Sequence, residues 1–143
     1  MKKLLLLSAF LISFQFSKAP HEGIQGEIFW VSGDQMPGPD KTRSAQSGVA
    51  REIQIYKSAT LKDVEQDGIF YKSVNTELVA TTWSKSDGTF KVKLPAGNYS
   101  IFTKEQKGLF ANLIDDGGCV SCVIVNPKKF SWVSFTVDYE AAY

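Results

Sequence analysis

Two cysteines are the residues of this chain whose spacing most directly suggests chemistry. Cys119 and Cys122 are the only two cysteines among the 143 residues, and they lie in the segment DDGGCVSCVIV. A C-x-x-C pair can be a redox centre, half of a metal site, a disulfide or a pair of packing residues. The sequence around the pair favours some of these alternatives over the others.

Redox and zinc chemistry are both disfavoured by the neighbouring residues. A redox-active C-x-x-C pair sits at a helix N-terminus, where the dipole lowers the thiol pKa, but here Cys122 leads into a β-branched segment that Pro127 ends. A closed zinc site needs about four ligands. Besides the cysteines the chain offers one histidine, the distant His21. We therefore expect no metal site and no cofactor.

A disulfide between Cys119 and Cys122 depends on the local backbone. In an extended strand, residues three positions apart are separated by about 10 Å, whereas a disulfide needs Cα atoms within about 4.4–6.8 Å. A β-turn brings its ends within about 7 Å, and the preceding Asp-Asp-Gly-Gly favours a turn. We predict a disulfide across a β-turn, with two reduced packing cysteines as the alternative.

Other catalytic groups are weakly supported. Asp115 and Asp116 are adjacent carboxylates, but neighbours on a turn point apart, and acidic turns are usually only solvated. The sequence has no G-x-S-x-G segment, no phosphate-cradling glycine loop and no pair of histidines at metal-binding spacing. We predict that the protein is not an enzyme.

Residues 1–19 have the composition of a secretory signal peptide. Two lysines precede an apolar run from Leu4 to about Phe14, which is shorter than the roughly 20 residues of a transmembrane helix. Pro20 would hinder cleavage directly before it, so a displaced cleavage site or a retained membrane anchor are the alternatives. We expect a secreted, periplasmic or cell-envelope protein, attached to a membrane only if this segment is retained.

The charge of the chain argues against polyanionic partners. Removal of residues 1–19 takes away three of the 16 basic side chains and none of the 15 acidic ones, which leaves a net charge of about −2. Nucleic-acid binding needs a basic surface, and electrostatic membrane binding needs a polybasic cluster. We therefore exclude nucleic acid as a partner.

Period-two patterning predicts that residues 20–143 form one all-β domain. The composition, 43% hydrophobic and 13% aromatic, is sufficient for a core. Segments with apolar alternation or β-prone residues are separated by turn signals and one long exposed loop at 32–48, and they cover residues 23–31, 51–57, 76–84, 89–94, 98–104, 109–114, 122–125 and 131–139. Seven or eight short strands predict an antiparallel β-sandwich.

The segment SKSDGTFKVKLPAGNYSIF contains two turn signals. Asp87 and Gly88 can supply the positive-φ positions of a tight hairpin, and Pro95 to Gly97 begin a second turn that returns the chain toward Tyr99. Together with GIQGEIFW and REIQIYK, this segment resembles the carboxypeptidase regulatory-like and transthyretin-like (prealbumin-like) domains of exported bacterial proteins. The resemblance covers residues 23–113 and implies a Greek-key sandwich, and its motif positions carry no catalytic residue.

Three tryptophans offer a binding chemistry. Trp30, Trp83 and Trp132 all fall in predicted strands, and we expect each to be buried or partly buried. Exposed in a planar row, they would stack on sugar rings, as in a carbohydrate-binding module. We predict an exported, non-catalytic binding or structural module with an envelope protein or a carbohydrate as partner, and we keep the carbohydrate-binding module as the alternative.

Overall fold

Strands make up nearly all of the regular structure. The computed structural model describes residues 21–39 and 46–143; the predicted signal peptide lies outside the described residues. In the described part the strands are β1 (Gly23–Asp34), β2 (Ser47–Gly48), β3 (Glu52–Lys57), β4 (Val64–Asp67), β5 (Phe70–Val74), β6 (Leu78–Trp83), β7 (Thr89–Lys93), β8 (Gly97–Glu105), β9 (Gly108–Phe110), β10 (Cys122–Val125) and β11 (Phe130–Ala142). A single helical turn, η1 (Leu61–Asp63), precedes β4.

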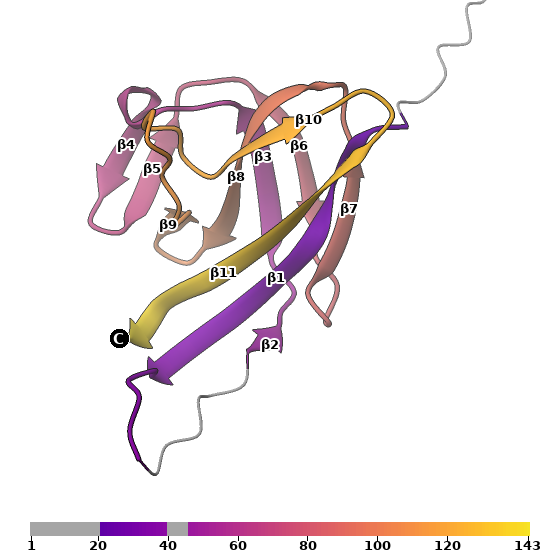
Figure 1. Ribbon diagram of the computed structural model, residues 1–143. Helices are drawn as coiled ribbons and strands as arrows, with labels where there is room; N and C mark the ends of the chain where they lie inside the picture. The colour runs from indigo at the N-terminus through magenta and orange to yellow at the C-terminus, as the bar shows by residue number, and fades with distance from the viewer. Residues whose placement is uncertain (1–20, 40–45) are drawn as a thin grey trace, which may run out of the picture.

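The strands form two sheets that pack as a sandwich (Figure 1). One sheet has the order β11-β1-β2, with β7 also paired to β1. The other has the order β4-β5-β9-β8-β3-β6, with β10 also paired to β8. The predicted all-β sandwich is therefore confirmed.

One strand pair departs from the antiparallel prediction. β1 and β11 run parallel along almost their whole length, from Gly23 opposite Phe130 to Asp34 opposite Ala142. Parallel strands need a long connection between them. Here nearly the whole described chain lies between β1 and β11, so the connection is long enough for either a parallel or an antiparallel pair. The apolar alternation of the two strands does not specify their relative direction either.

The core lies between the two sheets and follows the predicted alternation. On β1, Ile24 and Ile28 are fully buried, and on β11 Phe135 and Val137 are buried as well. They pack with the inward-facing residues of the second sheet, among them Ile53, Ile55, Tyr99 and Ile101. This burial of aliphatic and aromatic side chains is the main stabilising contribution to the fold.

The Asp87-Gly88 turn is real, but its setting differs from the predicted hairpin. Lys85 N–H donates to Thr89 C=O at 2.9 Å, which closes a local turn, yet this turn joins β6 of one sheet to β7 of the other. Gly88 has a φ of 88°. Asp87 is not among the positive-φ residues of the described chain; instead its carboxylate accepts the hydroxyl and N–H of Thr89, and these bonds lower the pKa of Asp87.

The Pro95-Ala96-Gly97 turn also crosses between the sheets. It leads from β7 into β8, which pair with different partners, so the chain turns here as predicted, but the two strands do not form an antiparallel pair. Gly97 is the first residue of β8, with a φ of 159° at the limit of the extended region. The fully buried Tyr99 donates its hydroxyl to the carbonyl of Pro95. The motif thus fixes a corner between two layers, with tyrosine as its anchor.

Residues 58–74 form an extension at one end of the seven-stranded sheet. Thr60 caps the short η1 turn, in which Asp63 completes a capping box. The β4–β5 hairpin follows, turning at Gly68 with a φ of 64°. Within the part of the chain that the structure describes, no helix has the length and apolar character needed to cross a bilayer.

Candidate functional site

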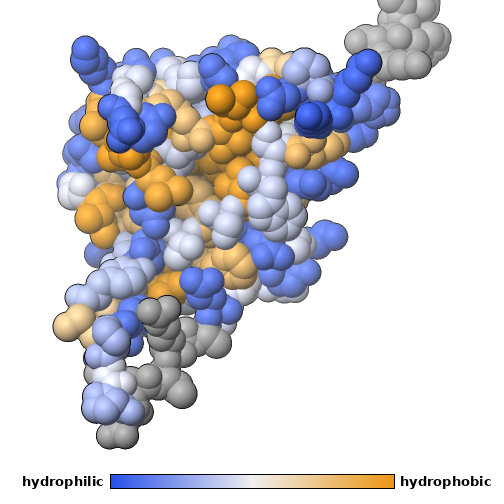
Figure 2. All heavy atoms as spheres, viewed as in Figure 1, coloured by the Kyte–Doolittle hydropathy of each residue, from blue (hydrophilic) through white to orange (hydrophobic). Residues whose placement is uncertain are grey.

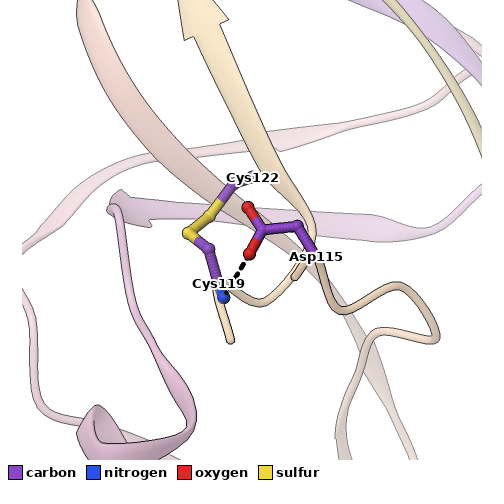
Figure 3. Close-up of side chains that lie close together, drawn as sticks. All are labelled: Asp115, Cys119 and Cys122. Atoms are coloured by element: carbon purple, nitrogen blue, oxygen red, sulfur yellow. Dashed lines mark hydrogen bonds between the residues drawn. A yellow bond between two sulfur atoms is a disulfide. The ribbon is translucent and has the colours of Figure 1, made fainter. Parts of the chain in front are cut away.

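Cys119 and Cys122 form a disulfide, as predicted (Figure 3). Their Cα atoms are 5.8 Å apart, which places the pair across a turn rather than along a strand. Ser121, inside the turn, has a φ of 41°. Asp115 holds the preceding loop, because its Oδ1 accepts the N–H groups of Gly117 at 2.9 Å and Cys119 at 2.8 Å.

The same loop brings together three residues of metal-ligating type. Ligand atoms of Asp115, Cys119 and Cys122 lie within 4.8 Å of one another. Zinc binds thiolate sulfur, and the two sulfur atoms here are bonded to each other. In this oxidised state Asp115 alone offers an anionic ligand, so the donor set does not fit a zinc site.

We expect reduction of the disulfide to lower the free energy of unfolding by about 2 kcal/mol or less, because the closed loop is short. The sandwich should stay folded, since the core lies mostly in other strands. Intact mass with and without reductant and alkylation reports the bond, and thermal melts of both forms report its contribution. Two alkylatable thiols without reductant, or unfolding upon reduction, would contradict this prediction.

A cleft lies between the disulfide loop, β10 and β11. Its volume is about 650 Å³, within the range of roughly 300–1,000 Å³ typical of ligand sites. Figure 2 shows apolar residues gathered on the face where β10 and β11 diverge. The cleft is lined by Ile101, Leu113, Ile114, Asp115, Cys119, Ser121, Cys122, Val123, Ile124 and residues 131–135.

Four large apolar side chains are left in solvent around this cleft. Their exposed fractions are 60% for Leu113, 48% for Ile114, 63% for Ile124 and 61% for Trp132. Leu113 and Ile114 lie in the loop that follows β9, Ile124 lies on β10 and Trp132 lies on β11. All four line the cleft. Scattered exposed apolar residues are ordinary, but a cluster around a concave site marks a binding surface.

The main chain of β11 is unpaired on the side that faces the cleft. Toward β1, Lys129 C=O accepts Gly23 N–H at 3.2 Å, whereas Thr136 C=O points away from β1 and accepts the Asn112 side chain at 3.0 Å. Backbone groups alternate in direction along a strand. The N–H and C=O groups of Trp132 and Ser134 therefore point away from β1, along an edge that no strand of the described chain pairs with.

β10 is also an edge strand. Among the described strands it pairs with β8 alone, and Ser121 C=O accepts Ile101 N–H at 3.1 Å on that side. By the same alternation, the backbone groups of Cys122 and Ile124 point away from β8. The Ile124 carbonyl accepts the hydroxyl of Ser131 on β11, which confirms this direction. Two strand edges thus diverge around the apolar cleft.

Two polar groups in the cleft wall remain available. Ser121 is buried, 7% exposed, and its hydroxyl has no hydrogen-bond partner among the described residues. An unpaired buried hydroxyl and a left-handed non-glycine backbone are both costly, and such costs concentrate at functional sites. Asp115 is the single ionisable side chain of the lining besides the bonded cysteines, and its Oδ2 has no hydrogen bond or ion pair within the described chain.

The three predicted tryptophans have different environments. Trp30 is partly buried, as predicted, with its ring 5.2 Å from that of Tyr139. The predicted burial of Trp83 and Trp132 is wrong, because they are 64% and 61% exposed. Trp132 precedes the inward-facing Val133 and so belongs to the outer face of β11. Trp83 lies on β6 of the opposite sheet, so the three rings form no row.

A second polar cluster joins the sheets away from the cleft. Glu105, at the end of β8, has a side chain only 5% exposed, and both its oxygens accept Arg51 Nε at 3.2 Å. Tyr139 on β11 donates its hydroxyl to the same carboxylate at 3.0 Å. Desolvation, reinforced by this bond, raises the pKa of Tyr139 to about 12. Each group has a partner, so the cluster is a structural bridge.

No family model, curated protein or solved structure matches this chain. The resemblance to carboxypeptidase regulatory-like and transthyretin-like domains stays a prediction from the motifs. The candidate site therefore rests on the geometry of the cleft. Its disulfide was predicted from the sequence and Trp132 was named as a possible stacking residue, whereas Leu113, Ile114 and Ile124 were not predicted as site residues. Two signals were present: apolar residues directly before the acidic turn, and Ile124 alternating with inward-facing Val125.

Proposed function

We propose that the protein is an exported, non-catalytic binding module whose ligand site is the cleft between β10 and β11. The observation that carries this proposal is the gathering of Leu113, Ile114, Ile124 and Trp132 around one concave site. The ligand is apolar over much of its surface, because burying those side chains on binding is favourable.

Export is supported by the predicted signal peptide together with the disulfide. Disulfides persist in oxidising compartments and are rare in the cytosol, and Cys119–Cys122 is a bonded pair. The pair is compatible with a periplasmic or extracellular location. The proposed site of action is the cell envelope or the extracellular space, and the proposed family is that of the carboxypeptidase regulatory-like sandwich domains.

A carbohydrate ligand is the second candidate, and it is favoured only by Trp132. This exposed ring lines the cleft and offers a face for a sugar. Trp83 lies in the other sheet and Trp30 packs against Tyr139, so a multi-ring platform is not formed. Stacking on a single ring would contribute little binding energy for a polysaccharide. An apolar ligand is therefore favoured.

The proposed function is tested with the neutral apolar dye N-phenyl-1-naphthylamine. We expect saturable binding with enhanced fluorescence, weakened about threefold or more by Ile124→Thr, because apolar contact area is lost. Ile69→Thr is the matched control, since Ile69 is similarly exposed, at 56%, and lies on the β4–β5 turn, outside the cleft lining. Equal binding by both variants would contradict the site. Saturable binding of a soluble polysaccharide that Trp132→Ala abolishes would support the carbohydrate alternative.

A further inference from the structure

We propose that the occupant of the cleft is an extended peptide segment of a partner protein, which adds as a strand to the free edge of β11. This inference rests on the proposed function, because it requires the cleft to be the ligand site. It adds the chemical class of the ligand and the way in which it is recognised.

The free main chain of β11 carries the first step of the argument. The N–H and C=O groups of Trp132 and Ser134 point away from β1 into the side of the cleft, and among residues 21–39 and 46–143 no strand pairs with them. Such groups recognise an extended backbone through ladder hydrogen bonds. From Trp132 to Thr136 the edge measures about 13 Å at the usual rise per residue, so it accommodates a segment of about five residues.

The apolar lining carries the second step. A strand added to β11 presents alternate side chains to opposite faces. One set enters the cleft, whose lining includes the buried Ile101 and Phe135 and the exposed Ile124 and Leu113. The segment is therefore apolar at every second residue. On binding, the segment would cover the exposed apolar side chains of the cleft lining.

Charge complementarity carries the third step. Asp115 is the only ionisable group of the lining apart from the bonded cysteines, and its Oδ2 is without a partner in the described chain. A cationic side chain at one end of the segment would pair with this oxygen. The buried Ser121 hydroxyl, unpartnered in the same wall, offers a further hydrogen bond. The partner segment is thus apolar at alternate positions and carries a lysine or arginine.

A partner segment suits the cleft better than a second copy of this chain. The edge of β11 is flanked by β10 and by the loop that contains Leu113 and Ile114. In an edge-to-edge dimer, β10 and this loop of one copy would collide with the same elements of the other copy. A single strand without such walls meets no comparable obstruction.

The test uses a synthetic peptide, acetyl-Lys-Thr-Val-Thr-Val-amide, titrated into the purified chain; its lysine and both valines lie on one face of the extended strand. We expect saturable binding by calorimetry, with protection of the Trp132 and Ser134 amides from hydrogen exchange. Ser134→Pro should weaken binding about tenfold or more, because proline removes the N–H that faces the peptide. Ser134 is exposed on an edge strand, where proline is tolerated. Ser134→Ala, which retains the N–H, is the matched control.

Two further comparisons separate the possible outcomes. A peptide with glutamate in place of lysine should bind more weakly, and Asp115→Asn should remove that difference. Unchanged peptide affinity in a folded Ser134→Pro variant would overturn strand addition. If the dye still binds and the peptide does not, the proposed function stands and this inference fails. Concentration-dependent dimers that protect the same amides would make a second copy the occupant and would likewise overturn it.

Discussion

Replacing Gly88 with alanine is expected to destabilise the sandwich by about 3 kcal/mol or more, because strain and a backbone clash add at one residue. Gly88 has a φ of 88°, and a Cβ there would lie 2.3 Å from the carbonyl oxygen of Ile28 and 2.9 Å from the Cα of Gly48. Neither contact is with a flexible side chain. Denaturant unfolding followed by far-UV circular dichroism measures the change.

The neighbouring hydrogen bonds explain why the backbone at Gly88 cannot relax cheaply. Ile28 N–H donates to Gly88 C=O at 2.8 Å, and Ile28 C=O accepts Val49 N–H at 3.1 Å. Moving the turn to admit a methyl group would break the two bonds that Ile28 makes on the edge of β1 that faces β7 and β2. Because Ile28 is fully buried, its main-chain groups have no water to replace them.

Gly68→Ala is the matched control for this prediction. Gly68 also has a positive φ, 64°, but no atom of the described residues lies within 4 Å of a Cβ built there. Only the strain of the left-handed backbone then remains, which costs about 1 kcal/mol. Equal losses at Gly68 and Gly88 would show that the close approach to Ile28 contributes nothing.

The same turn illustrates how far sequence reasoning reaches in this fold. Local chemistry predicted that the chain reverses at Asp87-Gly88 and again after Pro95, and it reverses at both places. It could not predict that each reversal passes to the other sheet, because strand pairing depends on which distant strand offers an edge. The parallel pairing of β1 with β11 is non-local in the same way.

In the candidate site, too, the features set by local sequence could be predicted and those set by distant strand pairing could not. The disulfide followed from spacing, turn geometry and the predicted export, all of which are local or compositional. The cleft arises because β10 and β11 diverge after a shared turn while pairing with different sheets. No pattern in either strand encodes that divergence. Exposure of Trp132, however, follows from the alternation of residues 131–139, because Val133 and Phe135 occupy the inward face and adjacent strand residues face opposite sides.

The bridge between the sheets gives the second large effect: Arg51→Met is expected to lower the free energy of unfolding by about 3 kcal/mol, because it leaves a buried carboxylate without its cation. The Glu105 side chain is 5% exposed and accepts Arg51 Nε at 3.2 Å. Arg51 also lies over the Trp30 ring at 5.4 Å, and this contact is lost too. Among the described side chains, Tyr139 alone would remain as a donor to Glu105. Chemical denaturation at neutral pH measures the loss.

Two variants show whether burial of the charge causes this loss. Lys104→Met removes the exposed ion pair with Glu52, whose nitrogen and oxygen are 3.7 Å apart, and should cost about 0.5 kcal/mol or less, as solvent-exposed pairs do. Arg51→Met combined with Glu105→Leu should be less destabilising than Arg51→Met alone, because no unpaired charge is then buried. The alternative outcome is that the double variant loses as much free energy of unfolding as Arg51→Met and Glu105→Leu together. In that case the lost packing of Arg51 and Glu105, rather than the unpaired buried carboxylate, accounts for the effect.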